Sequence, residues 1–343
     1  MPPGMTGAPL LELDNLSTHY VSGQGTRTVR AVDEVSLRLN AGETLGIVGE
    51  SGSGKSTLAL TIMRILPPAA RIVGGRMLFE GEDLVQKPED QMRHVRGKRI
   101  AMILQDPMVS LNPLFTIGDQ VAEPIRVHEG ERRSTAWSRA RELLRSVRIP
   151  SPETRLTQYP HEMSGGMRQR IVGAIGISCE PRLLIADEPT TSLDLTIQAQ
   201  YLKLLRDLQQ AHGLALIFIT HNLGIVAKMC DQLAVMYAGR VVESGPVSRI
   251  FNAPSHPYTR ALLNSIPRMG DSDQRLTAID GQPPDLSALP PGCSFAPRCP
   301  QAFPRCRDAA PPPFAPEEGR ISRCWLAEPS AVGSDFRVAS GVL

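Results

Sequence analysis

Apolar and polar residues alternate along positions 10–48, and this two-residue period predicts β-strands. The stretch ends in the apolar run 45–48, which is typical of a buried strand. A short strand pair is expected at 75–79, and the apolar run 99–104 predicts a further buried strand that stops at Gln105. We therefore expect the chain to begin with antiparallel strands that lead directly to the segment after residue 48.

The hydrophobic period changes to that of helices between about residues 116 and 180. Proline-containing turns separate three candidate helices in this stretch, at 116–128, 134–147 and 164–179. Beyond it the chain alternates between strands at 183–186, 214–220, 233–237 and 240–243 and helices at 196–211 and 222–230. Such alternation predicts a mainly parallel sheet covered by helices, into which the helical stretch is inserted.

From about residue 267 onward proline is dense and the hydrophobic period is lost, which by itself favours a disordered tail. Four of the six cysteines lie in this part of the chain: Cys293, Cys299, Cys306 and Cys324. Metal ligation orders chains that lack a core of their own. The cysteines therefore favour an ordered segment over a disordered one.

The composition excludes several classes of protein. With 343 residues, 41% of them hydrophobic and 21% charged, the chain is an ordinary soluble globular protein of one large or two ordinary domains. A net charge of +2 and an aromatic content of 4% give no reason to expect a nucleic-acid partner. No apolar run approaches the roughly 20 residues of a membrane-spanning helix, and the first residues lack the pattern of a signal peptide. We therefore expect a cytoplasmic protein that reaches a membrane only by docking onto other proteins.

A glycine-rich segment follows the apolar run at 45–48, and we call it the phosphate loop. Its residues are Gly49, Glu50, Ser51, Gly52, Ser53, Gly54, Lys55, Ser56 and Thr57. The glycines let backbone N–H groups turn towards phosphates, while Lys55 adds a positive charge and the Ser56 hydroxyl is a ligand for Mg²⁺. A helix that begins here presents its positive end to the same anion. A chance Gly/Ser-rich turn would not explain the strand before it and the apolar helical run after it.

Two carboxylates, Asp187 and Glu188, follow the strand predicted at 183–186. At the C-terminal edge of a parallel sheet, Asp187 is a candidate to hold Mg²⁺, and Glu188 is a candidate to orient and deprotonate an attacking water. Alone, such a pair is more typical of a solvated strand end. Because it follows a phosphate loop and a strand, it favours nucleotide hydrolysis.

A third motif opens the helix predicted at 164–179, and we call it the signature segment. It consists of Ser164, Gly165, Gly166 and Met167. Ser164 is a suitable N-cap, and the two glycines permit the close approach of another backbone. An ordinary capped helix explains the Ser-Gly-Gly start alone, but not its place between the other two motifs.

These three motifs resemble those of the ATP-binding subunits of ABC transporters, and the resemblance extends over roughly residues 10–330. The family's signature is normally Leu-Ser-Gly-Gly-Gln, whereas Met163 and Met167 stand at its first and last positions here. The fold implied is an α/β P-loop NTPase cassette with a mainly parallel sheet core, an antiparallel β subdomain and an inserted helical subdomain. The implied parts are a cassette at 10–253 with its helical subdomain at about 107–180, a C-terminal extension at 254–330 and a flexible tail at 331–343.

The same resemblance implies roles for further residues. Tyr20 corresponds to the aromatic residue that stacks on adenine, and Gln105 to the glutamine whose loop meets Mg²⁺ and the membrane subunit. His221 corresponds to the histidine that contacts the γ-phosphate. The loop that crosses the dimer interface consists of Ser192, Leu193 and Asp194. ATP and Mg²⁺ are the implied ligands, with Ser56, Gln105 and Asp187 around the metal ion.

Members of this family form head-to-tail dimers in which each ATP lies between one chain's phosphate loop and the other chain's signature. Residues 105–113 and 255–263 resemble segments of dipeptide and oligopeptide importers, so the implied role is energy coupling for peptide import. Nickel or glutathione is the alternative cargo, and a soluble, non-transport ABC ATPase is the alternative function. The implied partners are a second ATPase subunit, in a heterodimer rather than a homodimer, two transmembrane permease subunits and an extracytoplasmic substrate-binding protein. The implied location is the cytoplasmic face of the inner membrane.

The C-terminal cysteines have the spacing C-x5-C-x6-C-x17-C. Compact zinc sites usually pair cysteines two to four residues apart, so this spacing fits them poorly. Four thiolates also hold iron–sulfur clusters. Peptide-importer ATPases with this segment resemble cluster binders, which favours a [4Fe–4S] cluster at Cys293, Cys299, Cys306 and Cys324 over Zn²⁺.

Overall fold

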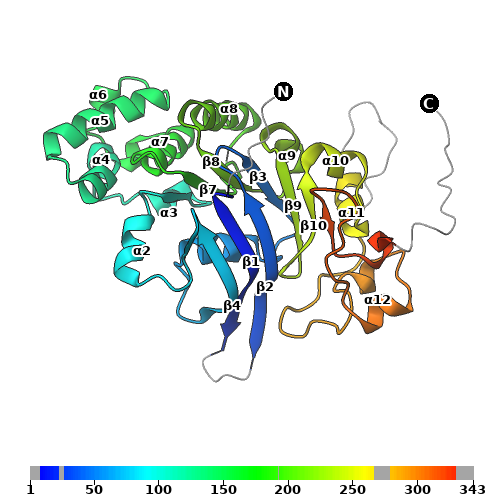
Figure 1. Ribbon diagram of the computed structural model, residues 1–343. Helices are drawn as coiled ribbons and strands as arrows, with labels where there is room; N and C mark the ends of the chain where they lie inside the picture. The colour runs from blue at the N-terminus through cyan, green and yellow to red at the C-terminus, as the bar shows by residue number, and fades with distance from the viewer. Residues whose placement is uncertain (1–7, 23–26, 192, 266–278, 330–343) are drawn as a thin grey trace.

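A seven-stranded sheet forms the centre of the molecule (Figure 1). In this computed structural model, which describes residues 8–22, 27–191, 193–265 and 279–329, the strand order is β11-β10-β9-β3-β8-β7-β6. The strands are β3 (Thr44–Val48), β6 (Ile100–Ile103), β7 (Leu183–Asp187), β8 (Ala215–Ile219), β9 (Gln232–Tyr237), β10 (Arg240–Pro246) and β11 (Ile321–Ser322). Strands β6, β7, β8, β3 and β9 pair in parallel, which confirms the predicted parallel sheet, whereas β10 and β11 are antiparallel additions at one edge.

A second, antiparallel sheet of four strands has the order β2-β1-β4-β5. Its strands are β1 (Leu11–Val21), β2 (Thr28–Leu39), β4 (Ala70–Phe79) and β5 (Glu82–Asp83). The apolar run 45–48 does not join it but forms β3 of the central sheet, where every residue is buried. Helix α1 (Lys55–Met63) contacts β1 and β2 as well as β7, so one apolar core joins the two sheets.

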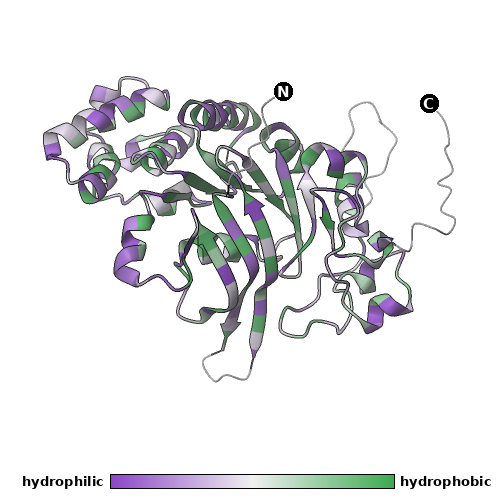
Figure 2. Ribbon diagram, in the orientation of Figure 1, coloured by the Kyte–Doolittle hydropathy of each residue, from purple (hydrophilic) through white to green (hydrophobic). Residues whose placement is uncertain are grey.

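The predicted helical insertion is present as a group of helices at one end of the molecule (Figure 1). Helices α4 (Ile117–Glu129), α5 (Arg133–Ser146) and α7 (Gly165–Ile177) contact one another, and their apolar side chains continue into the core on the central sheet. Hydrophobic residues gather on the central strands, and polar residues on the outer helices (Figure 2). The other helices before residue 265 are α2 (Glu89–Val95), α3 (Pro107–Ser110), α6 (Pro152–Arg155), α8 (Leu195–His212), α9 (Leu223–Met229), α10 (Val247–Asn252) and α11 (Pro257–Asn264).

The proline-rich segment 279–329 is ordered and packs against the edge of the central sheet that carries β10 (Figure 1). It contributes β11, α12 (Pro304–Asp308) and the short 3₁₀ turns η2 (Ala296–Arg298) and η3 (Trp325–Ala327). An aromatic cluster of Tyr237, Tyr258 and Phe295 joins it to β9 and α11. The buried ion pair of Arg320 with Glu243 of β10 ties the strand edge to the same segment. The tail predicted at 331–343 lies outside the described residues.

Candidate active site

The phosphate loop joins β3 to α1, and its backbone geometry requires glycine. Gly54 has a φ of +103°, and a Cβ on it would lie 2.0 Å from the carbonyl oxygen of Ala31 in β2. A Cβ on Gly49 would lie 2.2 Å from the carbonyl oxygen of Met236 in β9. No side chain fits at either position without moving the loop away from the strands that support it.

Lys55 is the cation enclosed by this loop. Its ammonium group donates hydrogen bonds to the carbonyl oxygens of Gly49 (2.8 Å) and Glu50 (2.9 Å). Burial lowers the pKa of Lys55, while the nearby carboxylates of Glu188, Asp187 and Glu50 act in the opposite direction. A buried ammonium whose closest partners are neutral carbonyls is suited to bind an anion, because phosphate oxygens form stronger, charge-assisted hydrogen bonds with it.

Asp187 ends β7 beside the loop, and 5% of the residue is exposed. Burial raises the pKa of Asp187, and a hydrogen bond with the Ser56 side chain acts against that rise. One of its carboxylate oxygens, Oδ1, is buried and has no hydrogen-bond partner. Oxygen ligands from a carboxylate and a hydroxyl are those that Mg²⁺ prefers, so Asp187 and Ser56 fit the metal ion of a nucleotide site.

The carboxylate of Glu188 is the point at which three other side chains meet. Its Oε2 atom accepts hydrogen bonds from Thr191 Oγ1 (3.0 Å) and Gln105 Nε2 (3.3 Å) and lies 3.4 Å from His221 Nδ1. Gln105 follows β6 and His221 follows β8, so three neighbouring parallel strands deliver these groups to one edge of the sheet. The sequence analysis did not predict that Thr191 contacts Glu188; Thr191 lies three residues after Glu188 and directly before Ser192 of the predicted interface loop.

The backbone of Glu188 has a φ of +44°, in the left-handed region that non-glycine residues rarely adopt. Its N–H donates to the carbonyl oxygen of Ile219 in β8 (2.9 Å), which holds this conformation in place. Backbone strain of this kind is stored at functional sites when the surrounding structure fixes it. The strained conformation therefore indicates that the Glu188 side chain must be held at one particular place. Asp187, which ends the strand, does not have such a conformation.

Tyr20 lies in β1 and its hydroxyl is 3.4 Å from Thr57 Oγ1, at the end of the phosphate loop. The side chain is half-buried and thus retains an open surface. Its position beside the loop is compatible with the predicted stacking on adenine, which stays a prediction.

The signature segment is not part of this cluster. Ser164 caps α7, where its hydroxyl accepts a hydrogen bond from the backbone N–H of Met167 (3.3 Å). Ser164 and Gly165 are exposed, and a Cβ on Gly165 would meet no atom within 4 Å. Among the described residues, none of the hydrogen bonds of residues 164–167 reaches the phosphate loop.

The predicted interface loop lies at the start of α8. Asp194 caps this helix by accepting hydrogen bonds from the N–H groups of Thr196 and Ile197, both at 3.0 Å. Leu193 is half-buried and packs against the helical core, whereas Leu195 is 83% exposed. Ser192 lies outside the described residues.

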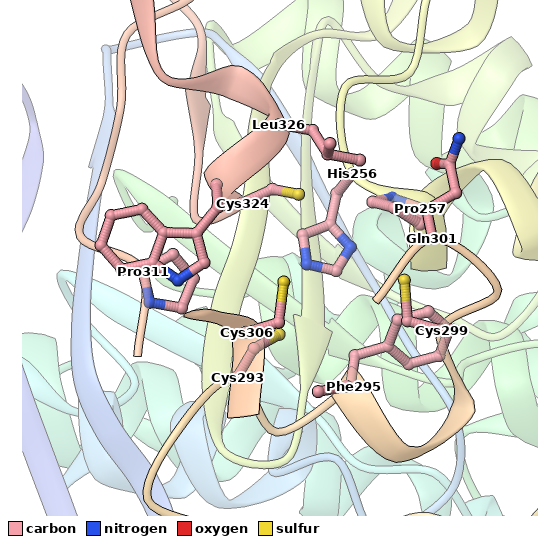
Figure 3. A pocket seen from close by; sticks show the side chains of 12 residues that line it. His256, Pro257, Cys293, Phe295, Cys299, Gln301, Cys306, Pro311, Cys324 and Leu326 are labelled. Atoms are coloured by element: carbon pink, nitrogen blue, oxygen red, sulfur yellow. The ribbon is translucent and has the colours of Figure 1, made fainter. Parts of the chain in front are cut away.

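The four C-terminal cysteines line one small cavity together with His256 (Figure 3). All four are free thiols. Burial raises the pKa of Cys293 and of Cys299, and it raises that of Cys324 to about 12. Cys293 and Cys299 pack against the apolar cluster around Tyr237, and Cys306 packs with Ala296 and Trp325. In this structure the thiols therefore pack as small apolar side chains.

The prediction of an iron–sulfur cluster at these cysteines is wrong. Within residues 8–22, 27–191, 193–265 and 279–329, no group of three or more His, Cys, Asp or Glu side chains is placed to hold a metal ion. The same finding gives no support to Zn²⁺. The prediction came from the family resemblance, and neither the resemblance nor the spacing of the cysteines shows whether their sulfur atoms converge on one point.

The family model for ABC transporters matches residues 32–191, and that for the oligopeptide/dipeptide transporter C-terminal region matches residues 242–306. The chain resembles a solved dimeric structure of the ATP-binding cassette MJ0796 in a post-hydrolysis state, with a TM-score of 0.62 and 23% identity. That match covers 69% of this chain and 98% of the other, and it shows the fold. No helix in the described part of the chain is long and apolar enough to cross a membrane.

Curated relatives cover nearly the whole chain. The "Probable peptide ABC transporter ATP-binding protein y4tR" of Sinorhizobium fredii is 51% identical over 92% of this chain and 94% of its own length. The dipeptide transport ATP-binding protein DppD of Escherichia coli is 48% identical over 92% of this chain and 96% of its own length. With this identity over most of its length and the cassette fold described above, the chain belongs to the family of ATP-binding proteins of peptide ABC transporters.

Proposed function

We propose that this chain is the energy-coupling ATPase subunit of a dipeptide or oligopeptide importer. The observation that carries the proposal is the convergence of Gln105, Thr191 and His221 on Glu188, next to a loop that encloses Lys55. The names of the relatives support a peptide as the cargo.

In the proposed reaction, Lys55 and the N–H groups of the phosphate loop bind the β- and γ-phosphates of ATP. Ser56, Asp187 and Gln105 would hold Mg²⁺, which neutralises charge on the phosphate oxygens. Glu188 orients a water molecule in line with the γ-phosphate and accepts its proton. His221 and Thr191 hold the Glu188 carboxylate in the orientation that this step needs.

The proposed active form is a dimer with a second ATPase subunit, and a heterodimer is favoured. The N-terminus of α7 supports a dimer, because Ser164 and Gly165 are exposed there and the positive end of the helix is open to an anion. In the dimer this helix end would bind the γ-phosphate of the ATP on the partner's loop. ATP would then close the dimer and hydrolysis would release it.

The proposed partners in the membrane are two permease subunits, joined on the outside by a substrate-binding protein. The segment after Gln105 supports such docking, since Val109, Leu114 and Phe115 are 79%, 81% and 54% exposed. Neighbouring exposed apolar side chains of this size mark interaction sites. This contact would hold the chain at the cytoplasmic face of the inner membrane.

The assignment of Glu188 is tested by Glu188→Gln. This variant should bind ATP as the wild type does and lower the turnover number by about 10²-fold or more, because the amide does not accept the proton of water. Glu180→Gln is the matched control, since Glu180 is an exposed glutamate with a similar left-handed φ of +50°. Near-normal ATP hydrolysis in Glu188→Gln would overturn the role of Glu188 as base.

The docking and cargo proposals are tested in the reconstituted complex. Leu114→Ser with Phe115→Ser should prevent co-purification with the permeases, while Val127→Ser, at an exposed position of α4, should not. Peptides added with the binding protein should stimulate ATP hydrolysis in the intact complex. Stimulation by nickel or glutathione, but not by peptides, would replace the cargo assignment.

A further inference from the structure

The C-terminal segment after residue 279 reaches the phosphate loop through one buried arginine, Arg298. Its guanidinium forms a two-pronged ion pair with the carboxylate of Glu50, with N–O distances of 2.7 and 3.0 Å. These residues are 248 positions apart in the chain. The Arg298 side chain is 4% exposed and that of Glu50 is 28% exposed. Paired, charge-assisted hydrogen bonds of this kind fix both position and orientation.

Arg298 is itself held firmly in place. Its guanidinium also donates to the carbonyl oxygens of Asp280 (2.9 Å) and Ile279 (3.1 Å) and to the Tyr237 hydroxyl (3.3 Å). The group lies 5.8 Å from the ring centre of Tyr237 and 6.0 Å from that of Phe295. A guanidinium with this many partners is a fixed point against which the loop is positioned.

Glu50 is held at three places, and two of its partners come from beyond residue 254. Arg298 binds its carboxylate, and its backbone N–H donates to the hydroxyl of Tyr258 in α11 (3.0 Å). Its carbonyl oxygen accepts the hydrogen bond from Lys55 (2.9 Å). Tyr258 of α11 and Arg298 of the C-terminal segment thus hold in place a residue that directly contacts the cation of the phosphate loop.

The charge of Glu50 makes this contact more than a structural support. A carboxylate in the phosphate loop repels a triphosphate, and the repulsion is strong in a partly buried site. Paired with Arg298, the carboxylate is neutralised, and both of its oxygens accept hydrogen bonds from the C-terminal segment.

We propose that Arg298 is a positioning residue that favours ATP binding through Glu50: by pairing with the Glu50 carboxylate, it removes the negative charge that would repel the triphosphate. The proposal rests on the assignment of residues 49–57 as the ATP site. Lys55→Ala tests that assignment separately: if ATP binding persists there, the site assignment fails, whatever Arg298 does.

The test is a charge-rescue experiment on the full-length chain, with Mg²⁺–ATP binding measured by calorimetry. Arg298→Met keeps an apolar side chain over the rings of Tyr237 and Phe295 but leaves Glu50 unpaired. It should raise the Kd for ATP roughly five- to tenfold, the effect of one uncompensated charge beside an anion, with kcat at saturating ATP changed less than about twofold. Adding Glu50→Gln to Arg298→Met should bring the Kd back to within about twofold of the wild type.

Arg305→Met is the matched control. Arg305 belongs to the same segment, pairs with Glu328 and lies 3.6 Å from the ring centre of Trp325, and within the described residues none of its hydrogen bonds or ion pairs involves the loop. It should leave the Kd unchanged. An unchanged Kd in Arg298→Met would overturn the proposal. A raised Kd that Glu50→Gln does not lower again would also overturn it, because the loss would then come from a structural role of Arg298 and not from the charge of Glu50.

If Arg298→Met fails to fold, the ATP affinity of the single variant Glu50→Gln tests the proposal. With the positive charge of Arg298 no longer balanced, the proposal expects ATP to bind as tightly as in the wild type or more tightly. Weaker binding in this variant would show that the carboxylate assists ATP, and would overturn the proposal.

Discussion

The phosphate loop at 49–57 is enclosed by its own chain, whereas the signature segment at 164–167 is exposed to solvent. A Cβ on Gly54 would lie 2.0 Å from a backbone oxygen of β2, but a Cβ on Gly165 would meet nothing within 4 Å. Both segments begin helices, and both offer backbone N–H groups to an anion. Gly54 therefore has a steric reason, within this chain, to be glycine, and Gly165 has none, although a Cβ on its neighbour Gly166 would lie 2.9 Å from the Ile197 side chain.

This difference shows that a glycine is required either by the fold of its own chain or by contact with a partner. Gly54 is required by the fold of the chain that carries it, so its loss should be visible in the isolated subunit. Gly165 has no such requirement, and the proposed dimer supplies one, because a partner's nucleotide would approach its backbone. Substitutions that are matched between the two segments therefore test the dimer as well as each site.

The largest effect is expected from Gly54→Ala. The added methyl group must displace either the loop or β2, so the variant should lose ATP binding by at least about 10²-fold and melt at a lower temperature. Gly52→Ala is the control for stability: Gly52 also has a positive φ, +77°, but open space around it, so the variant should lose only about 1 kcal/mol of folding free energy to backbone strain. Calorimetric titration with ATP and thermal melting distinguish them. Equal losses in both variants would show that strain, and not the contact with Ala31, controls the loop.

A smaller and more selective effect is expected from Gly165→Val. The isolated variant should bind ATP with the wild-type Kd and melt within a few degrees of the wild type, since valine at an exposed helix start has no neighbour to displace. ATP hydrolysis by the assembled complex should fall roughly tenfold or more, because the side chain would block the partner's γ-phosphate. Ser134→Val, in the exposed first turn of α5, is the matched control and should hydrolyse ATP normally. Normal hydrolysis in Gly165→Val would remove the signature segment from the proposed site.

The sequence predicted the parts of the site that depend on local pattern. The loop, the strand that delivers Asp187 and the capped start of α7 each follow from residues close together in the chain. Local pattern was sufficient for these parts because each motif, its strand and its helix are adjacent. Gln105 and His221 were assigned from the family resemblance, and they meet because the parallel strands β6 and β8 end at the same edge of the sheet.

The C-terminal segment shows where this reasoning stopped. The interpretation of the cysteines assumed that a proline-rich segment has no core and needs a metal ion. In the structure Phe295 packs on Tyr237 and Tyr258, and Arg320 pairs with Glu243, both across contacts that no local pattern reveals. The pairing of Arg298 with Glu50 could not be predicted from the sequence for the same reason, since the two residues are 248 positions apart in the chain.

Unlike the signature segment, the region around the phosphate loop contains a buried carboxylate, Asp187, whose ionisation should lower the stability of the folded chain. Burial raises the pKa of Asp187, so the folded chain without ligand is disfavoured while this carboxylate is ionised. Asp187→Asn should therefore melt at a slightly higher temperature than the wild type at pH 7, by no more than a few degrees, although Mg²⁺-dependent hydrolysis is lost. The sign follows from the raised pKa: stability from protonated Asp187 is fully present at low pH and is lost as the pH rises through that pKa.

Melting curves between pH 4 and pH 8 check this directly. The difference between Asp187→Asn and the wild type should shrink as the pH falls, because the wild-type carboxyl becomes neutral as well. A variant that melts below the wild type at pH 7 would show that Asp187 is stabilised as the anion, which contradicts the expected loss of stability on ionisation.

The smallest effect is expected from Met167→Gln, which restores the usual last residue of the family's signature. Met167 is half-buried and packs against the helical core, while its backbone N–H donates a hydrogen bond to the Ser164 hydroxyl. If the segment acts through backbone N–H groups and the helix end, exchanging the side chain should change ATP hydrolysis by less than about threefold and stability by less than about 1.5 kcal/mol. Ser164→Ala, which removes the cap of α7, should reduce hydrolysis more than this. A rate of ATP hydrolysis ten times higher or more in Met167→Gln would instead show that the glutamine side chain binds the partner's nucleotide. The signature segment of this chain would then support slower hydrolysis than the usual sequence of the family.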